Sequence, residues 1–205
     1  FADVFKNAGC TVKGVKSLTP DVLRSASIVV LPEPNSAYTP TEEKAIVDFV
    51  NNGGGLYAIA DHNKSDRNGD GIDSVGVLNR FLPKLGVQLD LRYFTEAPVG
   101  GEYRNTSITK GVTAVGVWGG TTVKPLSSTA EGHIFVSAKN GGGAYIVTAV
   151  VGPKGGRVVV MGDSSPYDDG TGDPHDKLYN GFSNPKFQHD VLAANTVRWL
   201  LEGSR

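Results

Sequence analysis

The stretch that most constrains the fold of this chain is residues 53–73, GGGLYAIADHNKSDRNGDGID. Its apolar run, residues 56–60, is short, continuous and preceded by glycines, which is typical of a strand buried on both faces of a sheet. The run ends abruptly at Asp61 and His62. Open α/β folds bind their ligands at the carboxyl ends of such strands. We therefore expect Asp61 and His62 to lie at that edge of the sheet, which is called the rim below.

The acidic segment DRNGDGID, residues 66–73, has the pattern of a calcium-binding loop. In such loops oxygen atoms at alternate positions converge on one cation, and a glycine makes the sharp turn. The expected ligands are Asp66, Asn68, Asp70, the carbonyl of Ile72 and Asp73, with Gly71 at the turn. Val77 stands where an EF-hand has its twelfth-position acid, so Asp73 completes the site only if the loop closes differently. The alternative is an acidic surface loop rich in turn-forming residues.

Composition narrows the classes of protein to consider. A chain of 205 residues suits one α/β domain, and its net charge of −1 gives no overall basic field for nucleic acid or anionic membranes. No apolar run reaches the length of a membrane span, and the first residues have no signal-sequence pattern. Cys10 is the single cysteine, which excludes an internal disulfide. The 27 glycines and the calcium-like loop favour an extracellular or periplasmic location.

Periodicity and turn residues predict the order of the elements. Helices are expected at residues 1–8, 19–26, 39–52, 78–85 and 184–201, and strands at residues 11–15, 27–31, 56–60, 87–91, 134–138, 144–151 and 157–161. Thr39, Pro40 and Glu42 match a helix capping box. Residues 87–155 form a β-rich excursion within what we expect to be a single domain. Because the chain begins inside a predicted helix, we also expect an upstream segment or other domains of the same protein.

Three of the expected apolar strands end in polar, loop-forming sequence. If these strands are parallel neighbours, their carboxyl ends share one rim, where α/β active sites lie. The candidate catalytic residues there are Asp61, His62, Asp163 and His175, and the candidate substrate-binding residues are Glu33, Asn35, Ser164, Ser165, Asp168 and Asp169. Acids this close raise one another's pKa unless a cation or a basic side chain compensates, and this is the argument for a second divalent metal at the rim. Imidazole beside carboxylates suits zinc, iron or manganese, whereas oxygen ligands alone suit calcium or magnesium.

These residues also have a purely structural interpretation. Asp61 and Asp163 could accept hydrogen bonds from backbone amides in the turns that follow, and residues 168–170 are ordinary turn sequence. His62 could be a polar residue at a strand end. The turn after residues 56–60 has no serine or cysteine and is therefore no nucleophile elbow. The chain also lacks a phosphate-binding Gly-x-x-x-x-Gly-Lys motif.

Residues 32–62 (PEPNSAYTPTEEKAIVDFVNNGGGLYAIADH), residues 155–170 (GGRVVVMGDSSPYDDG) and a closing helix that ends VRWLL resemble the class I glutamine amidotransferase-like superfamily. More narrowly, they are similar to its ThuA-like and intraflagellar-transport-like (GIFT) branches. The resemblance covers most of the chain as an order of elements. It implies a flavodoxin-like three-layer sandwich with a mainly parallel sheet, and a first strand upstream of the helix at residues 1–8.

Family amidotransferases carry a cysteine after the strand that matches residues 56–60, and a His-x-Glu pair after a late strand. In this chain Asp61-His62 stands at the first place and Asp163-Ser164-Ser165 at the second. The resemblance therefore does not extend to glutamine hydrolysis, which we do not expect.

Together these features predict a secreted, metal-binding hydrolase. Its site is the rim, braced by the calcium loop, and its substrate is a phosphoester, nucleic acid included, or a glycan. A second interpretation is a non-catalytic module that binds a carbohydrate or a protein through the rim acids and the rings of Tyr57, Tyr93, Tyr103, Tyr167 and Tyr179. A third is a structural domain of a larger enzyme. None of the three interpretations involves a membrane.

Overall fold

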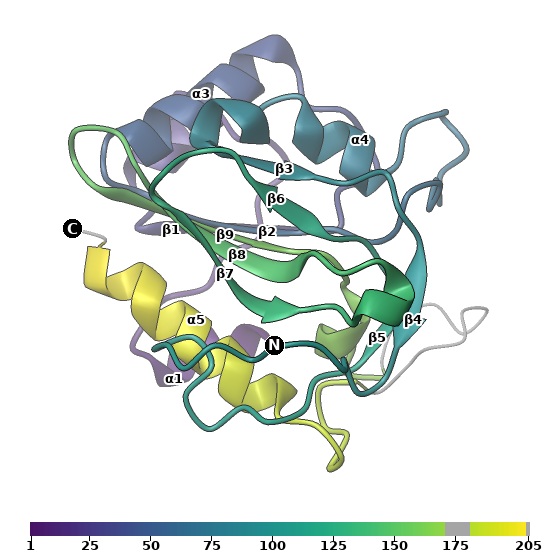
Figure 1. Cartoon of the computed structure of the whole chain (residues 1–205). Helices are drawn as coiled ribbons and strands as arrows, with labels where there is room; N and C mark the ends of the chain where they lie inside the picture. Colours follow the sequence, from purple (N-terminus) through teal and green to yellow (C-terminus); the bar gives the residue numbers. More distant parts are fainter. Residues whose placement is uncertain (171–180, 204–205) are drawn as a thin grey trace.

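The computed structural model describes residues 1–170 and 181–203, in which a mixed β-sheet lies between two layers of helices (Figure 1). This arrangement confirms the expected α/β class and the flavodoxin-like three-layer sandwich, in which parallel strands are joined by an antiparallel excursion. Within the described ranges, no helix is both long enough and apolar enough to cross a membrane.

The parallel part of the sheet consists of three neighbouring strands, β1 (Ile28–Pro32), β2 (Gly55–Ile59) and β9 (Gly156–Met161). Their registers align Leu31 with Ala58 and Ala58 with Val160, so the three strands end at the same edge. β2 is buried along its whole length, as expected for a central strand. The predicted rim is therefore formed by the segments that follow these three strands.

The remaining strands all come from the predicted β-rich excursion. They are β3 (Val87–Leu89), β4 (Phe94–Glu96), β5 (Val117–Gly120), β6 (Val123–Pro125), β7 (Ala130–Phe135) and β8 (Ala144–Val151). The strand order is β1-β2-β9-β8-β6-β3, with β7 also paired to β8, and every pair beyond β9 is antiparallel. β4 and β5 form a separate two-stranded ribbon.

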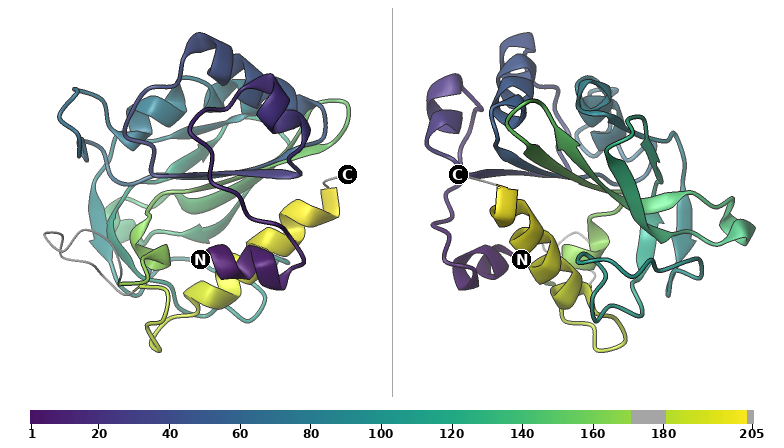
Figure 2. Two further views of the ribbon diagram at one scale, coloured as in Figure 1. Left: turned by 180° about the vertical axis from the view of Figure 1, so that it is seen from behind. Right: turned by 60° about the vertical axis from the view of Figure 1, so that its left-hand side comes forward.

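Helices cover both faces of the sheet (Figure 2). On one face lie α2 (Pro20–Arg24), α3 (Pro40–Asn51), α4 (Ser74–Asn79) and the 3-10 helix η1 (Leu82–Leu85), and on the other lie α1 (Ala2–Asn7), the 3-10 helix η3 (Ser165–Tyr167) and α5 (His189–Gly203). A short 3-10 helix, η2 (Ala138–Asn140), lies between β7 and β8. Successive strand residues face opposite sides, so Leu56 packs with the first layer and Tyr57 with the second.

Capping residues fix where the helices near the rim begin. The Thr39 hydroxyl accepts a hydrogen bond from the Glu42 N–H, and the Glu42 carboxylate accepts one from the Thr39 N–H, which is the predicted capping box. The other Glu42 oxygen accepts from the Leu18 N–H and so ties the segment before α2 to α3. Asp73 caps α4 by accepting from the Gly76 N–H.

Several details of the predicted secondary structure are wrong. Residues 11–15, expected as a strand, lie in an exposed segment outside the sheet. The helix expected at residues 78–85 is divided into α4 and η1, because Pro83 has no N–H for a continuous helix. The hairpin strand expected at residues 134–138 is β7, which begins at Ala130 and ends at Phe135. The last helix begins at His189 rather than at Asn184, whose side chain instead accepts from the Lys186 N–H in a turn.

Candidate functional site

The rim brings together three acidic side chains that the sequence singled out. Glu33 follows β1, Asp61 follows β2 and Asp163 lies just beyond the end of β9. The side chains of Glu33 and Asp61 are only 15% and 5% exposed, and the guanidinium of Arg67 forms ion pairs with both. Arg67 therefore supplies the positive charge that crowded carboxylates require.

Glu33 is held in a strained conformation at the end of β1. Its φ is 45°, a left-handed value that is uncommon outside glycine. Its N–H donates to the Ile59 carbonyl at 2.9 Å, which continues the β1–β2 ladder. One carboxylate oxygen pairs with Arg67, and the other accepts from the Ser164 hydroxyl at 2.7 Å. Burial raises the pKa of Glu33 and outweighs the opposing effects of Arg67 and Ser164.

Asp61 is buried, and both of its carboxylate oxygens accept hydrogen bonds. Oδ2 accepts from the Ser65 hydroxyl at 2.9 Å and from Arg67 Nη2 at 2.7 Å, while Oδ1 accepts from the His62 N–H at 2.7 Å. The backbone N–H of Asp61 donates to the Ser74 hydroxyl at the start of α4, at 2.9 Å. The loop between β2 and α4 thus folds back onto Asp61 and orients its carboxylate.

His62 lies beside an exposed aromatic ring at the border of the rim. Its Nδ1 is 2.8 Å from the Asn63 carbonyl, and its ring meets the Tyr93 ring edge to face, with centroids 4.8 Å apart. Tyr93 is 64% exposed. A Cβ atom on Gly119 of β5 would lie 3.1 Å from the His62 ring and 3.7 Å from Asp61 and Tyr93. The β4–β5 ribbon therefore closes one side of the rim.

Asp163 is fully buried and bonds to the backbone. Its Oδ2 accepts from the Trp118 N–H at 2.8 Å and its Oδ1 from the Ser165 N–H at 2.9 Å, which ties the end of β9 to β5 and to η3. Burial raises the pKa of Asp163 to about 7, and the two amide hydrogen bonds oppose that shift. Asp163 supports the rim from beneath and is not accessible to a ligand.

The remaining predicted binding residues lie in the segments that follow β1 and β9. The Asn35 side chain donates to the Glu33 carbonyl at 2.8 Å, next to the ion pair. Asp168 accepts from the Gly170 N–H at 3.0 Å and so shapes the turn after η3, and Asp169 lies exposed in that turn. His175, the fourth predicted catalytic residue, lies outside the described residues.

The predicted calcium loop is held together by its own side chains. The Asp66 carboxylate accepts from the N–H groups of Gly69 and Gly71 at 2.9 and 2.8 Å. The Asp70 carboxylate accepts from the Ile72 N–H at 3.0 Å. These bonds wrap the backbone tightly around the first two acidic positions, which is also the behaviour of turn-forming residues in general.

Asp73, the last predicted ligand, has a different role in this loop. Its carboxylate caps α4 and also accepts from the Lys64 N–H, where the loop begins. In the part of the chain that the structure describes, no three His, Cys, Asp or Glu side chains are grouped as metal ligands. Calcium binding by residues 66–73 thus stays a prediction.

Sequence reasoning missed Arg67, Ser65 and Ser74 as parts of the site. A signal was present, because Arg67 is a cation six residues after Asp61 in an acidic segment. Its other partner, Glu33, is 34 residues away in the chain. That pairing follows only once β1 and β2 are known to be neighbours.

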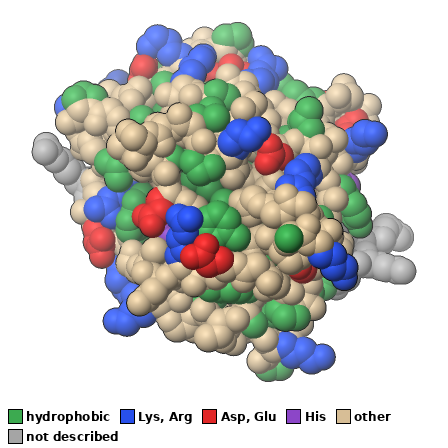
Figure 3. Space-filling view, in the orientation of Figure 1, with side chains coloured by type: hydrophobic (Ala, Val, Ile, Leu, Met, Phe, Trp, Pro, Cys, Tyr) green, Lys and Arg blue, Asp and Glu red, His purple; other side chains and the backbone are tan. Residues whose placement is uncertain are grey.

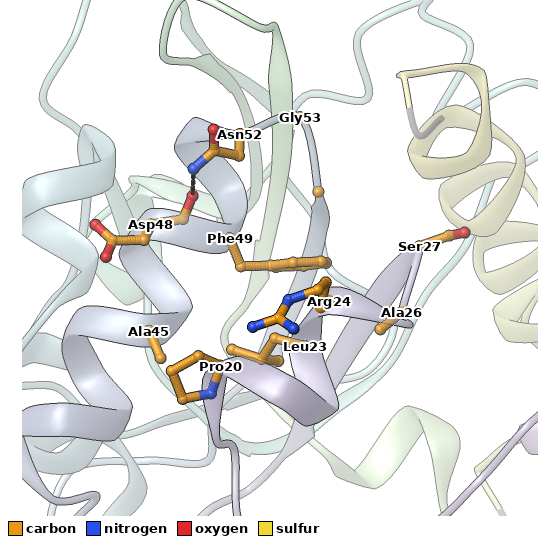
Figure 4. Close-up of a pocket in the computed structure, with 11 residues that line it drawn as sticks. Pro20, Leu23, Arg24, Ala26, Ser27, Ala45, Asp48, Phe49, Asn52 and Gly53 are labelled. Atoms are coloured by element: carbon orange, nitrogen blue, oxygen red, sulfur yellow. Dashed lines mark hydrogen bonds between the residues drawn. The ribbon is translucent and has the colours of Figure 1, made fainter.

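The structure also contains a cavity of about 370 Å³ at the opposite end of the sheet (Figure 4). Its lining includes Ser27 and Gly54, which precede β1 and β2, together with Leu23 of α2 and Phe49 of α3. Figure 4 shows the Phe49 ring extending from α3 toward α2. The predicted site residues do not line this cavity, so the cavity and the rim are separate features.

No protein-family model and no curated protein matches this sequence. Solved structures, however, match it over nearly its whole length. The mmIFT52 N-terminal domain is 13% identical with a TM-score of 0.70, and the match covers 97% of this chain and 87% of that one. A ThuA-like protein from Bacteroides uniformis is 14% identical with a TM-score of 0.59, and the match covers 100% of this chain and 84% of that one. The chain has a ThuA-like fold.

A similar fold also occurs as part of a longer chain. The exo-β-1,4-mannosidase Op5Man5 from Opitutaceae bacterium strain TAV5 is 13% identical with a TM-score of 0.52, and the match covers 98% of this chain but 30% of that one. At these identities the likeness extends to the fold alone.

Proposed function

We propose that the rim of this ThuA-like domain binds a carbohydrate without cleaving it. The observation that carries the proposal is the Glu33–Arg67–Asp61 cluster beside the exposed Tyr93 ring. Carboxylate and guanidinium groups are planar and offer paired hydrogen-bonding atoms, which suit the neighbouring hydroxyls of a sugar. An aromatic ring offers a flat apolar surface for the carbon–hydrogen face of the same sugar.

A neutral glycan suits the charge of the rim better than a phosphoester does. In the Glu33–Arg67–Asp61 cluster two carboxyl groups face a single guanidinium, so acidic groups outnumber basic ones, which disfavours a phosphate group there. On the face shown in Figure 3, basic and acidic side chains are interspersed, so that face has no continuous basic track for a nucleic-acid backbone.

Binding is favoured over hydrolysis because Asp163, one of the predicted catalytic acids, is fully buried and cannot reach a substrate. A divalent metal at the rim, expected from the sequence, would have to share Glu33 and Asp61 with Arg67. Hydrolysis of the bound glycan is the second candidate, because burial raises the pKa of Glu33 beside another carboxylate, an arrangement that glycosidases use for acid catalysis.

The test is a screen of the purified protein on a glycan array, followed by titration of each hit. We expect Tyr93→Ala to weaken binding by about tenfold, the loss of a stacking contact. The control is Leu126→Ala, which truncates another exposed apolar side chain. Leu126 lies far from Tyr93 along β3, because its N–H donates to the carbonyl of Gly86, which precedes β3, whereas Tyr93 follows β3. Absence of any hit, or equal affinities for wild type and Tyr93→Ala, contradicts the proposal.

The same glycans separate binding from turnover. We expect each bound glycan to remain intact after prolonged incubation, as followed by mass spectrometry. The variant Glu33→Gln retains the shape of the side chain. If products form with the wild type but not with Glu33→Gln, the domain is a glycoside hydrolase rather than a binding domain.

We also propose that the chain belongs to the class I glutamine amidotransferase-like superfamily, in its ThuA-like or GIFT-like branch. The matching element order and the similar solved structures support this placement at the level of fold. An extracellular or periplasmic location is a further part of the proposal, motivated by the calcium-like loop. Fractionation of cells that produce the native protein tests it.

A further inference from the structure

Residues 66–72, called the strap below, cross the rim as a largely exposed segment between β2 and α4. The strap keeps its own shape, because Asp66 and Asp70 bond to amides within it. Both of its ends are fixed. Ser65 bonds to Asp61 at one end, and Asp73 caps α4 at the other.

Two strap side chains hold it against the rim. Arg67 pairs with Glu33 and Asp61. The Asn68 amide donates to the Asn35 carbonyl at 2.6 Å and to the Ser36 hydroxyl at 3.0 Å. These partners lie at the ends of β1 and β2, so the strap can leave the rim without disturbing the sheet.

Closure of the strap hides the groups that a ligand would use. The Arg67 side chain is 53% exposed, whereas the two carboxylates that it covers are 15% and 5% exposed. A ligand that bonds to Glu33 or Asp61 must therefore displace the Arg67 guanidinium or arrive when it has moved.

We propose that the strap opens and closes as a unit over the rim, with Arg67 as its latch. A carbohydrate can then form hydrogen bonds to Glu33 and Asp61 only in the open state. This inference rests on the proposed function for the identity of the ligand. The movement itself depends only on the contacts of Arg67 and Asn68. Segments that cover ligand sites are commonly held by few contacts, so that they can open locally.

A crosslink between the strap and the rim tests the proposal. Ser36→Cys and Asn68→Cys replace two side chains in contact, in a Cys10→Ser background that removes the native free thiol. We expect the oxidised double variant to bind the array hit at least tenfold more weakly than the reduced one, with recovery on reduction. The single Asn68→Cys variant is the control and is expected to bind equally in both states. Equal affinity of the oxidised, crosslinked form and the reduced form overturns the proposal.

A second measurement requires neither ligand nor crosslink. Relaxation-dispersion NMR should find one shared exchange rate for the amides of residues 66–72 and the Arg67 side chain, absent from α3. Glu33→Gln removes one of the two acidic partners of Arg67 and should raise the population of the open state several-fold. Independent rates along the strap, or no exchange in either protein, overturn the unit movement. If the exchange is found but no glycan binds, the proposed function is contradicted while the proposed movement of the strap is supported.

Discussion

Asp163 is the buried acid at the end of β9, and its ionisation opposes folding. The pKa of Asp163 is raised to about 7, whereas the unfolded chain has the ordinary value near 3.8. Below that ordinary value Asp163 is protonated in both states. As the pH rises from about 4 to 7, the unfolded state loses its proton first, so the stabilisation from a neutral Asp163 is lost over this range.

Asp163→Asn should remove this contribution, since the amide cannot ionise. It will also lose one of the two accepted amide bonds, which costs about 1–3 kcal/mol. We expect the destabilisation by Asp163→Asn to be larger at pH 5 than at pH 8, by an amount on the order of 2 kcal/mol. Urea unfolding at both pH values measures it. A difference between wild type and variant that does not change with pH would show that Asp163 is not protonated in the folded protein.

At the scale of elements, the strap makes up most of the predicted calcium loop, residues 66–73. With Asp73 engaged at α4, two acids, one amide and one carbonyl are left as protein ligands, and low ligand charge gives weak calcium sites. We expect a dissociation constant on the order of 10⁻⁴–10⁻³ M, the range of extracellular modules. Calorimetric titration of calcium should find one site that is lost in Asp66→Ala.

The matched control for the calcium experiment is Asp21→Ala, which removes an equally charged, 86% exposed side chain on α2. It should bind calcium like the wild type. Asp73→Ala should lower the free energy of unfolding by about 1 kcal/mol through the lost helix cap. If calcium binds the wild type and Asp66→Ala equally, the ion sits elsewhere and residues 66–73 form only a turn.

Elements with strong local signals were predictable from the sequence. The capping box at Thr39 begins α3, and the glycine-bounded apolar run is β2, so the position of Asp61 at the rim followed directly. The partners of the rim acids were not predictable. Arg67 reaches Glu33 only because β1 and β2 are neighbours, and Asp163 is buried because β5 returns to cover it. Such contacts depend on the order of strands, which local periodicity does not encode.

At the scale of the whole molecule, one sheet serves two hydrophobic cores. Ile46 of α3 belongs to the core on one face and Leu192 of α5 to the core on the other, and both are fully buried. β2 contributes Leu56 to the first core and Tyr57 to the second. Because the two cores share this strand, the loss of one core also disrupts the other.

We therefore expect Ile46→Ala and Leu192→Ala each to lower the stability of the entire chain by about 2–5 kcal/mol, the usual cost of a large core truncation. Circular dichroism and tryptophan fluorescence should follow one coincident transition in both variants. Two separate transitions in either variant would mean that the chain is more than a single domain.

The position of Arg67 between Asp66 and Asn68 has a consequence for how two solutes would act on this protein. The neighbours on both sides are candidate calcium ligands, while the guanidinium itself holds two carboxylates beneath it. An ion that fixes the backbone here and a sugar that draws it away would compete for one segment. Thermodynamic reciprocity then requires that calcium lower the affinity for the sugar by the same factor by which the sugar lowers the affinity for calcium.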